Sequence, residues 1–311
     1  MIKCPVCDTK TDEVLTDKLR RGLGKVYYCK DCDLGFLQNM IIDTKDYYDN
    51  EYRKEYSHKA EENETNAEEI FDIYVNYQKE RIDALNKYKN NDDSFLEIGS
   101  SAGQFLSHIK DKFKSINAIE LDSNCCKFVE EKFKIATDSN YLEESKFNIK
   151  DNFSVVSAFQ VLEHTPDPIS FLKTIHHVLE DDGIALIEVP NLYDPLISVW
   201  DVPAYNTFYY HSAHSFYFSE KSLSIIAKKA EFEVLDFVYT QDYNILNHIN
   251  WILNDSPQND CVGGLNKPSL QGKDPEITNW LNNELNLLNE KYFEKLAESK
   301  KTSNILMVVK K

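Results

Sequence analysis

The sequence predicts an α/β fold in which helices cover both faces of a parallel β-sheet. Between residues 91 and 240, short β-like runs alternate with amphipathic helical patterns, and this alternation is typical of a parallel sheet. Gly183, which follows two aspartates, is expected to stop a helix before the next strand. The β-like runs lie at residues 94–98, 115–120, 153–158, 183–190 and 232–240. The helical patterns lie at residues 103–113, 123–133, 168–179 and 220–230.

Three further segments flank this core. Residues 1–40 contain two cysteine pairs, and we interpret them as a small metal-binding module. Residues 241–311 are expected to add an insertion, with a loop at 255–275, a helix at 276–299 and a last core strand at 304–309. Residues 41–90 place apolar side chains at helical spacing, which predicts a helical connector or cap; these side chains are Ile70, Ile73, Tyr74, Tyr77, Ile82 and Leu85.

The composition indicates one globular core with additions. Of the 311 residues, 42% are hydrophobic and 28% are charged, so we expect one core domain of roughly 200 residues. The formal net charge of −17 disfavours nucleic acid and anionic membranes as partners, because both are bound through lysine and arginine. No apolar run approaches the ~20 residues of a membrane span, and the first residues lack the apolar region of a secretory signal. We therefore expect a cytoplasmic protein with reduced thiols.

The two cysteine pairs predict a zinc site. Cys4 and Cys7 form one C-x₂-C pair, Cys29 and Cys32 form a second, and 21 residues separate the pairs. Zinc prefers four tetrahedral ligands, and four thiolates leave no open position, so we expect a structural Zn²⁺ that folds this short segment. Disulfides, unbound thiols or a redox role are the alternatives. The remaining cysteines are interpreted as structural thiols: Cys125, Cys126 and Cys261.

A turn of small residues follows the first core strand. The pattern Glu97-x-Gly99-x-x-x-Gly103 runs from strand through turn to helix. Small residues let the backbone approach a ligand, and N–H groups at a helix start suit a carboxylate or phosphate. Such a turn is also compatible with a dinucleotide, another nucleotide or no ligand. The next strand ends at Glu120, whose carboxylate can accept both ribose hydroxyls of an adenosine or can simply be solvated.

The pattern Glu97-x-Gly99-x-x-x-Gly103 followed by Glu120 resembles the first two motifs of class I S-adenosylmethionine-dependent methyltransferases. The segment 155–164, a β-like run that ends in Leu-Glu-His, is similar to the fourth-strand signature of that family. The resemblance covers residues 90–240 and the last strand. It implies a Rossmann-like sheet of seven strands with the last strand antiparallel.

The resemblance assigns a role to each residue of the first two motifs. Gly99, Ser101 and Gly103 would line the methionine moiety of S-adenosylmethionine. Ser101 stands where the family usually has glycine, and its small side chain should preserve the turn. Glu97 would orient the ammonium group of the cofactor, and Glu120 would hold the ribose hydroxyls.

Two more residues complete the cofactor site that the resemblance implies. Gln160, at the mouth of the fourth strand, would lie near the methionine end of the cofactor. Asp138, after the presumed third strand, would reach the adenine amine. A purely structural acid is the alternative for Asp138.

The zinc module before this core resembles the sugar C-methyltransferases of deoxysugar pathways and related enzymes of surface-polysaccharide clusters. In those enzymes the zinc module and a helical segment cap the acceptor side, and a histidine-rich stretch after the fifth strand reaches the substrate. Residues 205–219 match that stretch. The match implies acceptor-pocket walls, with core packing as the alternative, at Tyr205, Tyr209, Tyr210 and His211.

The two candidates for a catalytic base are His214 and His164. An imidazole with an ordinary pKa near 6.5 can take a proton at neutral pH, whereas the alternative is a core or capping histidine. The sugar enzymes have a glutamate before the equivalent of His214, where this chain has Ala213. This departure argues against C-methylation, which needs a base to form a carbanion.

The sequence therefore predicts methyl transfer from S-adenosylmethionine to a small polar metabolite. A sugar nucleotide, or another precursor of deoxysugars or surface polysaccharides, is the expected acceptor. One alternative is an RNA methyltransferase with a zinc ribbon, which the net charge of −17 disfavours. A second alternative is a non-catalytic scaffold that uses its zinc module.

Overall fold

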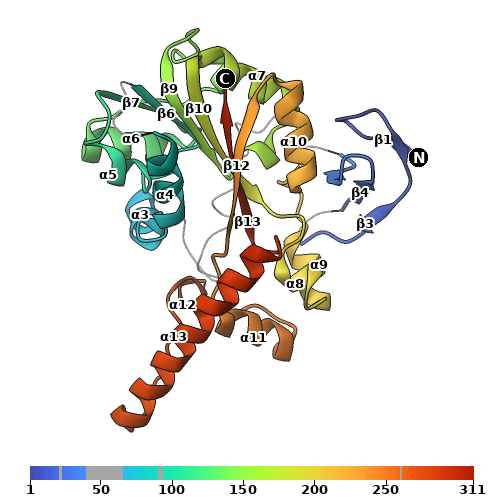
Figure 1. The fold of residues 1–311 in the computed structure, drawn as a ribbon, viewed down its shortest axis with the longest axis vertical. Helices are drawn as coiled ribbons and strands as arrows, with labels where there is room; N and C mark the ends of the chain where they lie inside the picture. The colour runs from blue at the N-terminus through green and yellow to red at the C-terminus, as the bar shows by residue number, and fades with distance from the viewer. Residues whose placement is uncertain (21–22, 40–65, 90–93, 260) are drawn as a thin grey trace.

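A central β-sheet with helices on both faces organises the molecule (Figure 1). The computed structural model describes residues 1–20, 23–39, 66–89, 94–259 and 261–311. The N-terminal module lies at one side of the sheet, and a long C-terminal helix extends away from it (Figure 1). No helix in these ranges is long and apolar enough to cross a membrane.

The central sheet has seven strands, as the sequence predicts. All neighbouring strands run parallel except β13, which is antiparallel to both of its neighbours. The strands in sheet order are β12 (Glu233–Thr240), β13 (Asn304–Lys310), β10 (Leu179–Pro190), β9 (Phe153–Phe159), β6 (Ser94–Ile98), β7 (Ser115–Ile119) and β8 (Ala136–Asp138). This order confirms the predicted Rossmann-like methyltransferase sheet with an antiparallel last strand.

The strands form where the sequence has continuous apolar runs. All seven residues of β9 are buried, because helices cover both faces of the sheet at this position. The third strand, β8, contains only three residues, so no periodic pattern marks it in the sequence. β10 begins at Leu179, and its pairing with β9 shifts register between Leu179 and Ile184. Gly183 therefore lies in an irregular part of a strand, and the prediction that it stops a helix is wrong.

Two groups of helices cover the two faces of the sheet. On one face, α7 (Pro168–Val178) and α10 (Glu220–Lys229) pack their apolar sides into the larger core cluster. On the other face lie α5 (Leu106–Ile109) and α6 (Ser123–Phe133). α5 is much shorter than the predicted helix at 103–113, because a turn occupies residues 101–105.

The described part of the connector is helical, as the sequence predicts. α3 (Ala67–Tyr74) and α4 (Lys79–Tyr88) form two short helices beside the sheet. Asn66 and Glu69 form a capping box at the start of α3, and Ile70 packs against Ala102 and the first turn of α6. The predicted connector residues 41–65 and 90 lie outside the described residues.

The N-terminal module shares a sheet with the core. β1 (Ile2–Lys3) pairs with β2 (Lys10–Thr11) in a small hairpin. A second sheet has the order β11, β5, β4 and β3, and β11 comes from the stretch after the fifth core strand. Its strands are β11 (Phe216–Tyr217), β5 (Leu34–Leu37), β4 (Val26–Cys29) and β3 (Val14–Thr16).

The C-terminal segment follows the predicted order of loop, helix and strand. α11 (Ile245–Asn254) follows β12, and a short helix, α12 (Val262–Leu265), interrupts the stretch that we expected to be a loop. The long helix α13 (Pro275–Glu298) leads into β13. Two further short helices, α8 (Pro195–Ser198) and α9 (Pro203–Tyr209), lie beside the histidine-rich stretch.

Candidate active site

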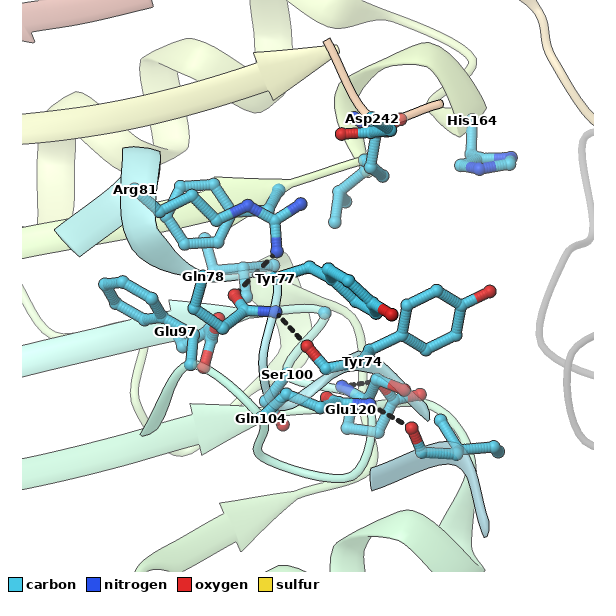
Figure 2. Close-up of a pocket in the computed structure, with 18 of the residues that line it drawn as sticks. Tyr74, Tyr77, Gln78, Arg81, Glu97, Ser100, Gln104, Glu120, His164 and Asp242 are labelled. Atoms are coloured by element: carbon cyan, nitrogen blue, oxygen red, sulfur yellow. Dashed lines mark hydrogen bonds between the residues drawn. The ribbon is translucent and has the colours of Figure 1, made fainter. Parts of the chain in front are cut away.

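A cavity of about 1380 Å³ opens at the carboxyl ends of the parallel strands. Ligands of open α/β sheets bind at this edge, where strand order reverses. Residues after β6, β7 and β9 line one side of the cavity, and α3, α4 and the loop between them line another. Figure 2 shows side chains from the helical connector and from the turn after β6 in this pocket.

The turn after β6 places backbone directly against the cavity. Gly99 has φ +73°, and a Cβ there would lie 2.4 Å from Cγ2 of Val161, so only glycine fits. Gly103 has φ +77° and does not line the cavity; its missing side chain lets the turn approach Val129 of α6. Ser101 lines the cavity with φ +47°, the left-handed conformation that glycine adopts more easily.

Glu120 lies at the end of β7, at the edge of the same turn. Its Oε2 accepts a hydrogen bond from the Ser101 N–H at 2.6 Å, and its Oε1 accepts one from the Asp122 N–H at 2.8 Å. These bonds fix the carboxylate beside the turn, where it lines the cavity. The predicted ribose contact therefore has a carboxylate in a suitable place.

Glu97 is buried at the end of β6 and faces the cavity (Figure 2). Its Oε2 has no hydrogen-bond partner among the described residues. Burial raises the pKa of Glu97 to about 8, Arg81 opposes this shift, and the Glu120 carboxylate adds to it. A buried acceptor without a donor costs free energy, so this oxygen suits a cationic ligand group such as an ammonium.

A buried ion pair joins the helical connector to the sheet. The Nε of Arg81 donates to both carboxylate oxygens of Glu188 at 3.2 Å, and its Nη1 donates to Oε1 of Gln78 at 2.9 Å. The guanidinium also lies over the ring of Phe159, 4.5 Å from its centre. We did not predict this pair from the sequence, because the partners are 107 residues apart.

Gln160 lines the cavity next to this ion pair. Its backbone has φ +59°, and its Nε2 donates to Oε1 of Glu188 at 3.0 Å and to Oδ1 of Asn304 at 3.2 Å. A strained residue held by its surroundings is typical of a functional site. Asp138, in contrast, does not line the cavity. Its carboxylate accepts hydrogen bonds from three residues of the following loop, which are Asn140, Ser145 and Lys146.

The predicted adenine contact of Asp138 therefore has no support from the position of its side chain. Six other residues line the cavity just after Glu120 in the chain or shortly after β8, and they were not predicted: Leu121, Asp122, Tyr141, Leu142, Glu143 and Glu144. Their sequence neighbourhood is irregular, so no periodic pattern marks them.

A family model described as a methyltransferase domain matches residues 68–236, which is more than half of the chain. This chain belongs to that methyltransferase family. An S-adenosylmethionine-dependent methyltransferase from Archaeoglobus fulgidus shows the same fold, with a TM-score of 0.51 and 18% identity over 78% of this chain and 97% of that chain. One from Clostridium acetobutylicum has a TM-score of 0.46 and 11% identity over 77% of this chain and 91% of that chain. No curated protein sequence matches this chain.

The cavity lining contains fewer of the predicted acceptor-pocket aromatic residues than expected. Tyr205 lines the cavity, together with Phe208 and Trp251, which we had not predicted. Tyr209 does not line it, and its hydroxyl donates to the backbone oxygen of Asn191 at 2.6 Å.

Two other predicted wall residues also lie outside the cavity lining. Tyr210 is buried against Tyr217, with ring centres 4.8 Å apart. The backbone N–H of His211 donates to the Tyr217 hydroxyl at 2.9 Å. These contacts belong to the sheet that joins the N-terminal module to the core, which is the packing alternative for both residues.

The two candidate histidines lie side by side, with ring centres 4.7 Å apart. His164 follows the Leu-Glu turn and lines the cavity (Figure 2), whereas His214 is not among the residues that line it. Burial lowers the pKa of His164 to about 4, and the Ala213 carbonyl opposes this shift. Burial lowers the pKa of His214 well below its ordinary value, and His211 and His164 add to the effect. Both imidazoles are therefore neutral at pH 7.

The four N-terminal cysteines form a compact cluster. Their Sγ atoms all lie within 4.8 Å of one another, and those of Cys7 and Cys29 are 3.6 Å apart. Four thiolates around one Zn²⁺, with Zn–S bonds of about 2.3 Å, are spaced by roughly 3.8 Å. The cluster is thus compatible with the predicted zinc ribbon.

Proposed function

We propose that this protein transfers a methyl group from S-adenosylmethionine to a small polar metabolite, with a sugar nucleotide or a related sugar precursor as acceptor. The observation that carries the cofactor assignment is the buried Oε2 of Glu97, beside the turn at Gly99, which has no hydrogen-bond partner in the part of the chain that the structure describes. An ammonium group fits beside this oxygen, and the backbone at Gly99, which lines the same cavity, leaves room for the rest of the amino-acid end of the cofactor.

Different residues of the cavity would bind the cofactor and the acceptor in such a reaction. S-adenosylmethionine supplies an electrophilic methyl group on a sulfonium. Glu97 would bind the ammonium end of the cofactor and Glu120 the ribose, so the two carboxylates fix both ends of one ligand. Of the two predicted bases only His164 lines the cavity, and burial lowers its pKa to about 4, so its neutral imidazole would accept a hydrogen bond from the acceptor rather than hold a proton at pH 7.

A cationic side chain, in a lining rich in carboxylates, supports a polar acceptor that carries an anionic group. The N-terminal module contributes Arg20, whose guanidinium lies 3.8 Å from the ring centre of Phe208. Guanidinium groups bind phosphates through paired hydrogen bonds, and aromatic walls enclose the rest of a small ligand. Tyr205 and Trp251 supply such walls. A diphosphate-linked sugar would match this combination of groups.

We also propose that the four-cysteine cluster binds a structural Zn²⁺. The sulfur spacing supports this assignment, and so does the size of the module, since a segment this short has little core of its own. The module lies against the stretch that contains β11, so the zinc would stabilise the acceptor side of the cavity.

The test combines calorimetry with a methyl-transfer assay. We expect S-adenosylmethionine to bind with a stoichiometry of one, and we expect radiolabelled methyl groups to appear on at least one member of a sugar-nucleotide panel. Absence of cofactor binding would overturn the enzymatic proposal. Cofactor binding with transfer to ribosomal RNA, and to none of the sugars, would replace the acceptor class with RNA.

A further inference from the structure

A buried carboxylate lies beside the two histidines with no donor to satisfy it. Glu163 is 1% exposed, and neither of its carboxylate oxygens has a hydrogen-bond partner among the described residues. The buried Nδ1 of His214 also has no hydrogen-bond partner within the described ranges. A buried carboxylate in this state needs a cation or a proton to offset its desolvation.

The spacing of the three side chains is that expected for a shared cation. Oε1 of Glu163 lies 3.7 Å from Nε2 of His164 and 3.9 Å from Nε2 of His214. Both distances are too long for a hydrogen bond, so a proton on Glu163 would gain no bond to either ring. Two ligands that share one metal ion at about 2.0–2.2 Å stand roughly 3–4 Å apart. The observed spacing therefore matches a shared ion.

The tautomer of His164 also suits a metal ligand. Its Nδ1 lies 2.8 Å from the Ala213 carbonyl oxygen, which can only accept, so Nδ1 carries the proton and Nε2 carries the lone pair. A backbone carbonyl that orients a ring in this way is the usual outer partner of a metal-binding histidine. A second hydrogen bond, from the Ser215 N–H to the Glu163 backbone oxygen at 2.7 Å, ties the two chain segments together.

We infer that Glu163, His164 and His214 form a binding site for a divalent transition-metal ion at the wall of the cavity. Their ligand atoms all lie within 4.8 Å of one another, so small side-chain rotations would bring them onto one ion. Two imidazoles and one carboxylate suit Mn²⁺, Fe²⁺ and Zn²⁺, and three protein ligands leave positions open for water or substrate.

The site also bears on acceptor activation, and this extension rests on the proposed function. Glu163 reaches His214 from the neighbouring turn. An ion bound by the triad would lower the pKa of an acceptor hydroxyl or of a bound water, a task that otherwise needs a side-chain base.

Titration of the zinc-loaded, full-length protein with MnCl₂ tests the site. Mn²⁺ prefers oxygen and nitrogen ligands, so it should leave the thiolate cluster occupied by zinc. We expect calorimetry to show one equivalent of Mn²⁺ bound to the wild-type protein, and electron paramagnetic resonance to show the signal of an immobilised ion. Glu163→Gln and His214→Gln should each weaken this binding at least tenfold.

Two controls make the result specific. His177→Gln, at an exposed position on α7, should bind Mn²⁺ as the wild type does. Glutamine has the same shape as glutamate but no charge, so the Glu163→Gln variant should fold and bind S-adenosylmethionine normally. Wild-type protein that takes up no Mn²⁺ and no second zinc equivalent would overturn the site, as would variants that bind Mn²⁺ unchanged. Metal binding without methyl transfer would leave the site in place and refute the proposed function instead.

Discussion

The backbone of Ser101 and the side chain of Glu120 are joined across the cofactor turn by a hydrogen bond of 2.6 Å. The bond links the turn after β6 to the end of β7, so the shape of the turn and the position of the carboxylate depend on each other. It also explains how a residue other than glycine keeps the turn in place, because Glu120 holds the N–H of a residue with φ +47°.

Replacing Glu120 by alanine should weaken S-adenosylmethionine binding by about 1–3 kcal/mol, the cost of losing a carboxylate that two ligand hydroxyls would share. Calorimetric titration measures this. Asp111→Ala, at an exposed carboxylate outside the cavity lining, is the matched control and should bind the cofactor as the wild type does. Equal affinity in the Glu120 variant would contradict the proposed position of the ribose.

The left-handed backbone of Ser101 should make the turn sensitive to side-chain branching. Ser101→Gly relieves the conformation but adds flexibility to the unfolded chain, so the free energy of unfolding should change by less than about 1 kcal/mol. Ser101→Val should lose roughly 1–2 kcal/mol, because β-branched residues rarely adopt positive φ. Urea denaturation compares the variants. A valine variant as stable as the glycine variant would show that the turn is not strained.

The buried pair of Arg81 and Glu188 should be costly to break from one side only. Arg81→Met leaves the Glu188 side chain, which is 4% exposed, without its cation, so we expect a loss of about 3–5 kcal/mol in the free energy of unfolding. Adding Glu188→Gln to this variant should recover part of the loss. Lys79→Ala breaks an exposed i,i+4 pair on the same helix and should cost under ~0.5 kcal/mol. Equal losses for Arg81→Met and Lys79→Ala would refute the argument from burial.

The core strands and the cofactor turn could be predicted from the sequence, because both depend on local patterns. Continuous apolar runs mark strands that are buried on two faces, and small residues after the first run mark the turn. β8 has three residues and β11 has two, which is too short for any periodic pattern. Their positions depend on neighbours distant in the chain.

The acceptor side was harder to predict, because residue type does not determine which face a side chain occupies. Tyr205 lines the cavity, whereas Tyr209 and Tyr210 pack into the junction with the N-terminal module. The sequence marks all three only as aromatic. Glu163 belongs to the Leu-Glu-His segment that resembles the family signature. The sequence does not show that its carboxylate is buried, lacks a hydrogen-bond partner among the described residues and lies close to His214.

Asp194 should make folding stability depend on pH. Burial raises its pKa from 3.8 to about 7, although hydrogen bonds from the Leu196 N–H and the Tyr205 hydroxyl oppose the shift. The folded protein therefore keeps this proton up to about pH 7, whereas the unfolded chain releases it near pH 4. Since the unfolded state binds fewer protons in this window, the stabilisation is complete below about pH 4 and is lost as pH rises to 7.

Asp194→Asn should remove this decrease in the free energy of unfolding between pH 4 and pH 7. At pH 8 we expect the variant to be more stable than the wild type by on the order of 2–4 kcal/mol, and at pH 4 the two should be similar. Urea denaturation at both pH values measures the difference. A constant difference between pH 4 and pH 8 would show that Asp194 titrates normally in the folded protein.

Removal of zinc from the cysteine cluster should destabilise residues 211–219 and leave the turn at residues 99–103 unchanged. β5 pairs with β11 through Phe36 and Phe216, and the Ser219 hydroxyl donates to the Asp33 backbone oxygen at 2.7 Å. The N-terminal module therefore holds the stretch that carries His214. The turn at residues 99–103 lies outside this junction.

Cys32→Ser should abolish stoichiometric zinc and increase amide hydrogen exchange across residues 211–219, because structural zinc sites contribute folding free energy to the segments they hold. S-adenosylmethionine affinity should change by less than about threefold, while methyl transfer falls at least tenfold. Cys261→Ser, at a cysteine outside the cluster, is the control and should leave zinc content and exchange unchanged. Unchanged exchange at 211–219 in the zinc-depleted Cys32 variant would show that β11 keeps its place without the module, and the role of zinc on the acceptor side would then be refuted.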